Sequence, residues 1–125
     1  MSDNYQFDFI VIGSGIAGLS FALKTAKHGT VAVITKKSQS ESNTNYAQGG
    51  IAAVMDPLDS FEQHIQDTLD AGCGLCNMAA VELMVKDAPE CINELIQRGV
   101  EFTREENGKL ALGREGGHHA NRVTF

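Results

Sequence analysis

The stretch FDFIVIGSGIAG at residues 7–18 decides the fold class of this chain. Its first half, Phe7–Ile12, is short, apolar and rich in β-branched residues, which is typical of a parallel strand buried on both faces. Its second half leads into apolar residues at three- and four-residue spacing, which indicates a helix that stops by Gly29. The run Val31–Thr35 reads as a second buried strand. We therefore expect a compact strand–helix–strand unit with a right-handed crossover.

The corner between this strand and helix satisfies the pattern G-x-G-x-x-G. Gly13 permits a tight turn, Gly15 lets a ligand approach the backbone, and Gly18 lets the helix pack closely on the sheet. Free N–H groups and the positive end of the helix dipole then face the ligand. The corner therefore predicts a site for the diphosphate of a dinucleotide, against the alternative of a glycine-rich turn without a ligand.

An acidic residue that binds a ribose hydroxyl is expected about 20 positions after this corner. The chain instead has Lys36 and Lys37 at the end of the second strand. A lysine here can reach the adenosine side of a cofactor or a phosphate, or it can be solvated loop charge. The absence of the acidic residue argues against simple NAD specificity.

Two further polar motifs follow. Residues 42–53 combine short polar side chains with the diglycine Gly49–Gly50, a pattern suited to a polar cofactor but also to a flexible linker. Residues 112–122 hold two arginines, two histidines and Glu115 beside a second diglycine. Arginine binds carboxylates through two N–H groups and a glutamate pairs with an ammonium group, so this motif fits an amino dicarboxylic acid. A solvated charged loop is the alternative.

The remaining pattern completes an α/β chain of 125 residues, a length that suits one domain. We expect a loop over 36–58 with a short strand at Ile51–Met55, and a helix that begins with a capping box of Ser60 and Gln63. A second helix starts at Asn77 and is interrupted or restarted at Pro89. Two segments that flank Asn107-Gly108, residues 100–104 and 109–112, predict a small β-hairpin.

Composition excludes several classes of protein. A formal net charge of −6 disfavours a general nucleic-acid or anionic-membrane partner, and no apolar run is long enough to cross a membrane. Three cysteines make an odd count, so a complete disulfide framework is not expected and a reducing cytoplasm fits best. We read the Cys73–Cys76 pair as a turn and Cys91 as a packing residue. Adjacent histidines without nearby Cys or Asp ligands predict no metal site.

Taken together and in this order, the three motifs resemble the L-aspartate oxidase family of the succinate dehydrogenase/fumarate reductase flavoprotein superfamily. The resemblance runs over nearly the whole chain and implies a Rossmann-like FAD-binding domain. It implies that Glu115 orients the substrate through its amino group, with His118 a second candidate in the same segment. The FAD contacts that it implies are Gly13, Ser14, Gly15, Ile16, Ala17, Gly18, Lys36, Asn43, Thr44, Asn45, Tyr46, Ala47, Gln48, Gly49 and Gly50.

Asn43 stands where the membrane-complex members of this superfamily have a histidine that bonds covalently to the flavin. An amide nitrogen is too poor a nucleophile for that bond, so we expect non-covalent FAD. The resemblance also implies oxidation of L-aspartate to iminoaspartate, reoxidation of the flavin by O2 or fumarate, and a link to quinolinate synthase in NAD biosynthesis.

The chain reads as the N-terminal part of an FAD-binding domain, because residues 122–125 look like the start of a further element. We expect the capping domain and the catalytic arginine to lie beyond Phe125, so that this piece has no turnover alone. Two other functions stay open: a soluble fumarate reductase or succinate dehydrogenase flavoprotein, and a non-catalytic nucleotide-binding module.

Overall fold

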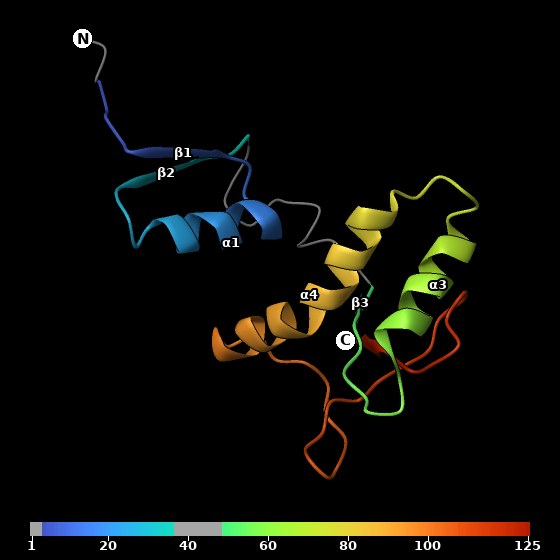
Figure 1. Ribbon diagram of the computed structural model, residues 1–125. Helices are drawn as coiled ribbons and strands as arrows, with labels where there is room; N and C mark the ends of the chain where they lie inside the picture. Colours follow the sequence, from blue (N-terminus) through green and yellow to red (C-terminus); the bar gives the residue numbers. More distant parts are fainter. Residues whose placement is uncertain (1–3, 37–48) are drawn as a thin grey trace. The chain divides into compact units, whose positions relative to one another are not determined.

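The computed structural model describes residues 4–36 and 49–125 (Figure 1). The chain divides into two compact units, residues 1–48 and residues 49–125. The glycine corner lies in the first unit and residues 112–122 lie in the second, so each unit is described by itself.

The first unit is the expected strand–helix–strand motif. Its elements are β1 (Phe9–Ile12), α1 (Ile16–Thr25) and β2 (Val31–Ile34). The two strands are parallel, and their register runs from Phe9 opposite Val31 to Ile12 opposite Ile34. The Rossmann-like start predicted from the glycine corner is confirmed.

Burial of the two strands is one-sided among the residues that the structure describes. Val11 and Ala22 are buried between the strands and α1, whereas Ile10 and Ile12 are 62% and 85% exposed. The expectation of strands buried on both faces is therefore not met within the described part of the chain. The reason is that α1 covers one face of a sheet of only two strands.

The ends of β1 and β2 are joined by a side chain. The Asp8 carboxylate accepts hydrogen bonds at 2.8 Å from both the N–H and the hydroxyl of Thr30. The backbone and side-chain bonds from Thr30 lower the pKa of Asp8. A Cβ on Gly29 would come within 2.7 Å of this carboxylate, so the glycine leaves the room that the contact needs.

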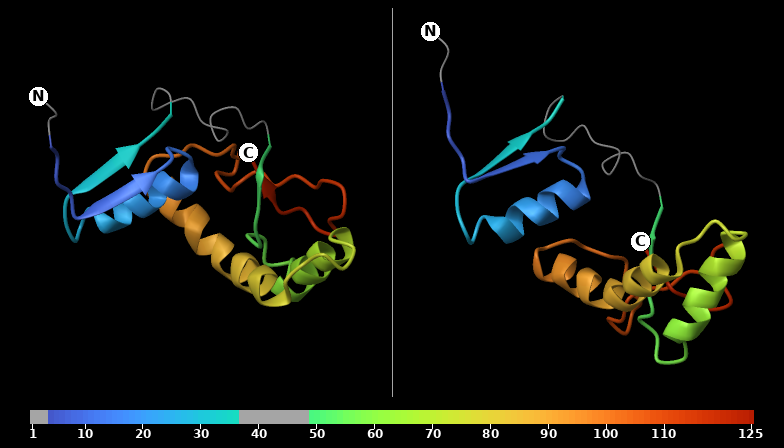
Figure 2. Two further views of the ribbon diagram at one scale, coloured as in Figure 1. Left: turned by 90° about the horizontal axis from the view of Figure 1, so that it is seen from above. Right: turned by 45° about the horizontal axis from the view of Figure 1, so that its top comes forward.

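The second unit pairs two short strands and two helices. β3 (Ile51–Ala52) is antiparallel to β4 (Val123–Thr124), with Ala52 opposite Val123. α3 (Phe61–Ala71) packs against α4 (Met78–Gln97). Both views in Figure 2 show the chain after α4 returning to place β4 beside β3. The strand expected at Ile51–Met55 exists but is shorter.

Two side chains fix where the helices begin. Ser60 Oγ accepts from the backbone N–H of Gln63 at 3.1 Å, and Asn77 Oδ1 accepts from the N–H of Ala80 at 3.1 Å. The capping box at Ser60 is half formed, because the Ser60 N–H donates to Asp59 at 2.8 Å instead of to the Gln63 side chain.

α4 is continuous through Pro89, so the predicted interruption is wrong. Proline removes one backbone donor, and the helix tolerates that loss here. Val85 and Ile92, each only 1% exposed, lie on either side of Pro89 and anchor both halves of the helix in the core of the unit.

The expected hairpin around Asn107-Gly108 is present in a short form, because the Glu105 N–H donates to the Lys109 carbonyl and the Ala111 N–H to the Thr103 carbonyl, each at 2.9 Å. The left-handed Gly108 (φ +83°) lies in it, and Arg104 and Leu110 form an isolated bridge. Cys91 is exposed, so its reading as a packing residue is wrong. In the part of the chain that the structure describes, no helix is both long and apolar enough to cross a membrane.

Candidate functional site

The corner between β1 and α1 depends on two glycines. Gly13 has φ +108°, a conformation that side chains rarely adopt, and its N–H donates to the carbonyl of Ile34 at 2.8 Å. A Cβ on Gly18 would overlap the carbonyl oxygen of Gly13 and lie 3.4 Å from the Val11 side chain. The chain therefore turns sharply at Gly13, and the helix lies as close to the strand as a bare backbone permits.

The N-terminus of α1 carries no side-chain cap. Gly15 is the N-cap residue, with φ −73° and ψ 173°, and the first turn contains no acidic residue. The first turn of a helix leaves backbone N–H groups without intrahelical partners, and its dipole favours negative charge. This bare corner fits the diphosphate of a dinucleotide, which supplies the acceptors that a capping side chain would otherwise provide.

The corner is tied to the end of β2. Ser14 is buried, and its hydroxyl lies 3.1 Å from the hydroxyl of Thr35. Lys36 follows directly and is exposed. Ser14, expected at the diphosphate, and Lys36, expected on the adenosine side, are therefore both near the carboxyl end of the parallel pair, where open α/β sheets bind ligands.

Most of the second motif cannot be placed, since Asn43, Thr44, Asn45, Tyr46, Ala47 and Gln48 lie outside the described residues. Among the described residues, apart from its chain neighbours, no atom lies within 4 Å of the Cβ position of Gly49. Gly50 is crowded, because a Cβ there would overlap the Val123 side chain and approach the Thr124 carbonyl at 2.5 Å. Close packing of β3 on β4 thus accounts for Gly50 without a ligand.

The third motif forms a loop closed at its base, residues 113–122, which we call the 113–122 loop. Gly113 and Val123 exchange two backbone hydrogen bonds of 2.8 and 3.0 Å, and the Arg122 N–H donates to the Gly113 carbonyl at 2.9 Å. Within the loop, the N–H of His118 donates to the carbonyl of Glu115 at 3.2 Å. The turn places the Glu115 side chain on the surface and turns His118 partly inward.

Arg122 is completely buried at the end of this loop. Its Nε and one terminal nitrogen donate to both carboxylate oxygens of Asp59, at 2.8 and 2.7 Å. Its other terminal nitrogen donates to Asp67 at 2.7 Å. The sequence suggested that the motif's arginines bind a dicarboxylate, but the guanidinium of Arg122 is already occupied by carboxylates of its own chain.

Asp67 is the centre of the cluster. Its carboxylate also accepts from the Gln63 amide at 2.8 Å, from the His119 N–H at 3.0 Å and from the His119 ring. Burial acts to raise the pKa of Asp67, but the bonds from His119, Gln63 and Arg122 outweigh it and hold the pKa far below its usual range. Asp67 is therefore a buried anion that joins α3 to the loop.

Next to this cluster lie two histidines in edge-to-face contact, His64 of α3 and His118 of the loop, with ring centroids 5.9 Å apart. Burial lowers the pKa of His64, and the charges of Arg122 and His118 act in the same direction. Nδ1 of each ring is buried without a hydrogen-bond partner. His64 is thus kept neutral beside a candidate functional histidine.

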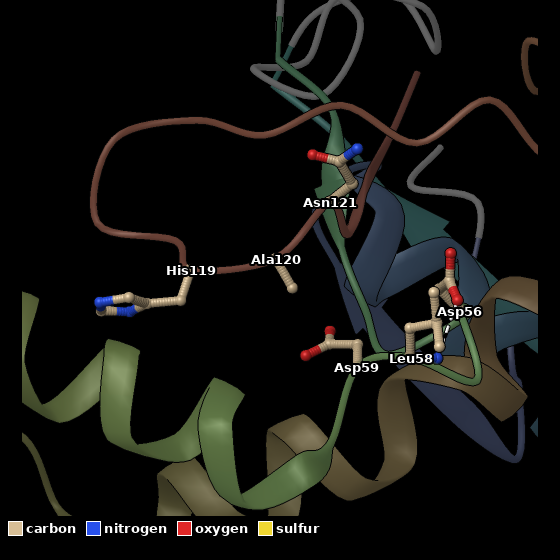
Figure 3. Close-up of a pocket in the computed structure, with 6 residues that line it drawn as sticks. All are labelled: Asp56, Leu58, Asp59, His119, Ala120 and Asn121. Carbon is tan, nitrogen blue, oxygen red and sulfur yellow. Dashed lines mark hydrogen bonds between the residues drawn. The ribbon is translucent and has the colours of Figure 1, made fainter.

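A pocket of about 290 Å³ opens on the cluster (Figure 3). Two segments, residues 56–59 and 119–121, face each other across it. Within residues 4–36 and 49–125, no three His, Cys, Asp or Glu side chains gather in a way that could hold a metal ion.

Sequence reasoning missed Asp59, Asp67 and His64. Asp59 directly precedes the N-cap of α3, and Asp67 and His64 are one helical turn apart. The signal available was three polar side chains on or just before one helix, together with an arginine far along the chain. The spacing of these residues along the sequence does not predict that they are in contact.

A family model described as FAD binding domain matches residues 8–125. L-aspartate oxidase 2-a, chloroplastic, of Nicotiana tabacum is 58% identical over 118 residues, which are 94% of this chain and 18% of that protein. L-aspartate oxidase of Vibrio cholerae is 49% identical over 124 residues, covering 95% of this chain and 23% of the relative. This chain therefore spans about a fifth of the length of the curated relatives that it matches.

Solved structures match over nearly the whole chain. A variant of the E. coli quinol fumarate reductase subunit FrdA superposes with a TM-score of 0.91 at 34% identity, covering 97% of this chain and 21% of that one. Sdh1 of Mycobacterium smegmatis, in complex with UQ1, gives a TM-score of 0.89 at 35% identity, covering 95% and 20%.

Proposed function

The chain belongs to the FAD binding domain family, and from that premise we propose that it supplies the FAD-binding corner and one side of the substrate site of an L-aspartate oxidase. The substrate part of the proposal rests on relatives named L-aspartate oxidase that are 46–58% identical to it over 94–98% of its length. We further propose that residues 1–125 form the N-terminal part of the FAD-binding domain, with the capping and C-terminal domains elsewhere in the protein.

The observation that carries the proposal is the bare corner at the start of α1. Gly13 turns the chain in a left-handed conformation, Gly18 leaves no room for a side chain, and Gly15 leaves the helix uncapped. A diphosphate here accepts from backbone N–H groups and faces the positive end of the helix. We assign Lys36 to the adenosine side of FAD, and the resemblance assigns residues 43–50 to its flavin end.

The bound flavin would supply the two-electron chemistry, accepting a hydride from Cα of L-aspartate to leave iminoaspartate and passing the electrons to O2 or fumarate. This chain's own contribution is to bind and orient. Glu115 is exposed on the 113–122 loop, where its carboxylate can pair with the substrate ammonium group. His118, next to it in the loop, is the second candidate for substrate contact.

The test is the visible spectrum of the full-length protein, recorded anaerobically before and after addition of L-aspartate. We expect a bound flavin that is bleached by L-aspartate. In the variant Gly15→Val we expect most of the flavin to be lost, because the added side chain stands where the diphosphate approaches. The φ and ψ of Gly15 are open to valine, so the fold should survive. A yellow Gly15→Val protein with wild-type affinity for FAD would contradict the proposal.

A second candidate is a soluble fumarate reductase or succinate dehydrogenase flavoprotein. The observation in its favour is the superposition on the FrdA and Sdh1 chains at 34–35% identity. Glu115 separates the two candidates, because succinate has no ammonium group for it to bind. Bleaching of the flavin by succinate but not by L-aspartate would decide for the second candidate and against an oxidase.

Non-covalent attachment of FAD is part of the proposal and rests on Asn43. Denaturing the full-length protein in acid should release all flavin from the polypeptide, and flavin that stays with the precipitate would contradict it. If this activity is found, we propose that oxidation of L-aspartate is the first step of NAD biosynthesis and that quinolinate synthase consumes the iminoaspartate. The cytoplasmic location stays a prediction, since the plant relatives are named chloroplastic and the bacterial ones are not.

A further inference from the structure

The 113–122 loop has one anchor on its own backbone and one on α3. Its base is closed by the hydrogen bonds between Gly113 and the Arg122–Val123 segment. Its far end is bound to α3, because Asp67 accepts from the backbone N–H and the ring of His119. Glu115 and His118 lie between these two anchors.

The second anchor is positioned by the start of α3. The Ser60 cap fixes where the helix begins. His64 and Asp67 are three residues apart on this helix, so both lie on the face toward the loop. Gln63 donates to Asp67 from the same face and lies 3.5 Å from the His119 ring. The helix therefore offers an acceptor for the loop backbone and, next to it, an aromatic surface for His118.

The cluster is built more strongly than loop attachment alone requires. Asp59 already pairs with Arg122 through two hydrogen bonds, which satisfies most of the buried guanidinium. Asp67 adds one bond to Arg122 but two to His119, a residue whose side chain is 72% exposed. Asp67 is a buried anion that accepts most of its hydrogen bonds from the 113–122 loop. Its bonds therefore hold this loop in position as well as stabilising the fold.

We propose that Asp67 is a positioning residue for the substrate loop: by binding His119 it fixes the turn that presents Glu115 to the amino group of the substrate. This inference rests on the proposed function and extends it to residues that touch neither flavin nor substrate. Its consequence is selective. Loosening the loop should weaken binding of a dicarboxylate that carries an ammonium group and spare one that lacks it.

The experiment uses full-length enzyme with bound FAD and compares Asp67→Asn, His119→Ala and the control Asp70→Asn. Asp70 is on the same helix, but its carboxylate is exposed and bonded to Gln66. The readouts are flavin content, KM and kcat for L-aspartate, and the dissociation constant of succinate from the change that it causes in the flavin spectrum.

We expect KM for L-aspartate to rise about tenfold in His119→Ala, because the loop loses the ring bond to Asp67 and keeps only the backbone one. Asp67→Asn should show at least the same rise, whereas Asp70→Asn should behave as wild type. Flavin content and the dissociation constant of succinate should stay within about twofold of wild type. If Asp67→Asn holds no flavin because it does not fold, His119→Ala decides alone, since its ring is on the surface.

Two results would overturn the inference. One is an unchanged KM for L-aspartate in a His119→Ala enzyme with full flavin content. The other is a parallel weakening of L-aspartate and succinate, which indicates a general structural role. A wild-type enzyme that holds FAD but is not reduced by L-aspartate is a different outcome, because it refutes the proposed function itself.

Discussion

The two polar regions of this chain are built in opposite ways. The corner at residues 13–18 depends on residues without side chains. Gly13 is left-handed, Gly15 brings no side-chain cap to the helix, and Gly18 lets the helix pack directly on the strand. The cluster around Arg122 consists of buried side chains, in which each of the three guanidinium nitrogens donates to the carboxylate of Asp59 or Asp67. The first brings no side-chain cap to the helix that it opens, and the second uses its side-chain donors within the protein.

This difference explains why the two regions suit different tasks. A backbone corner offers the same N–H groups whatever side chains surround it, so it binds the constant part of a cofactor. A charged cluster such as that of Asp67 is specific to its own partners, so it fixes the position of a loop. Variants that change one region should therefore leave a signature that the other cannot produce.

The largest effect is expected from Arg122→Leu. It leaves Asp59 and Asp67 as two buried carboxylates without a counter-charge, a change that typically costs about 3–5 kcal/mol. Hydrogen exchange of the α3 amides in the full-length protein measures it. The matched control is Lys86→Met, which breaks an exposed pair with Glu82 and should cost below about 0.5 kcal/mol. Equal protection of α3 in both variants would show that the cluster carries no stability.

Gly18→Val should come next. The added side chain overlaps the carbonyl of Gly13, so α1 must move away from β1, at a cost of about 1–3 kcal/mol. Flavin content should fall with it, because the N-terminus of α1 moves too. Gly116→Ala is the control, since Gly116 has no positive φ and nothing lies within 4 Å of its Cβ position. Full flavin content in Gly18→Val would contradict this prediction, because it would show that FAD binding does not depend on close packing of α1 on β1.

Acid should act mainly through the cluster. The folded-state pKa of Asp67 is depressed, so its contribution is complete above the unfolded carboxyl pKa of about 3.9 and is lost as the pH falls toward the folded value. The thermal midpoint of wild type should therefore drop below about pH 4, and less steeply in Asp67→Asn. Asp8→Asn, which changes an exposed carboxylate with a lowered pKa, should alter the slope less. If Asp8→Asn changed the pH dependence of the thermal midpoint more than Asp67→Asn does, the cluster would not be the main acid-sensitive site.

The smallest effect is expected from Ser60→Ala. It removes the side-chain cap of α3 and should cost about 1 kcal/mol, read from the thermal midpoint of the protein. Ser60→Asp keeps an acceptor for the Gln63 N–H and should restore most of the loss. If Ser60→Ala also raises KM for L-aspartate, the register of α3 contributes to the position of the loop.

Local sequence patterns predicted the first unit well and the second unit in part. The glycine spacing and two β-branched runs were enough for β1, α1 and β2, because these elements follow one another directly in the chain. The helices α3 and α4 were predicted from capping residues and apolar periodicity. The interruption at Pro89 was not found, because buried side chains on both sides outweigh the loss of one donor.

The charged cluster could not be predicted, because it brings together residues that no local pattern connects. Arg122 was grouped with its sequence neighbours as a dicarboxylate ligand, whereas its partners lie on and before α3. The glycine corner has a sequence signature because its chemistry is in the backbone of one short segment. A network of long-range ion pairs has none until the fold is known.

The contacts of Arg122 also set an order of events during synthesis and folding. Asp59 and Asp67 precede Arg122 by 63 and 55 residues, so their bonds close long loops of chain. On the ribosome both acids emerge first and stay hydrated until the segment with Arg122 arrives. Contacts of such separation form slowly, so docking of that segment should be a late step in maturation of the second unit, after its two helices have formed.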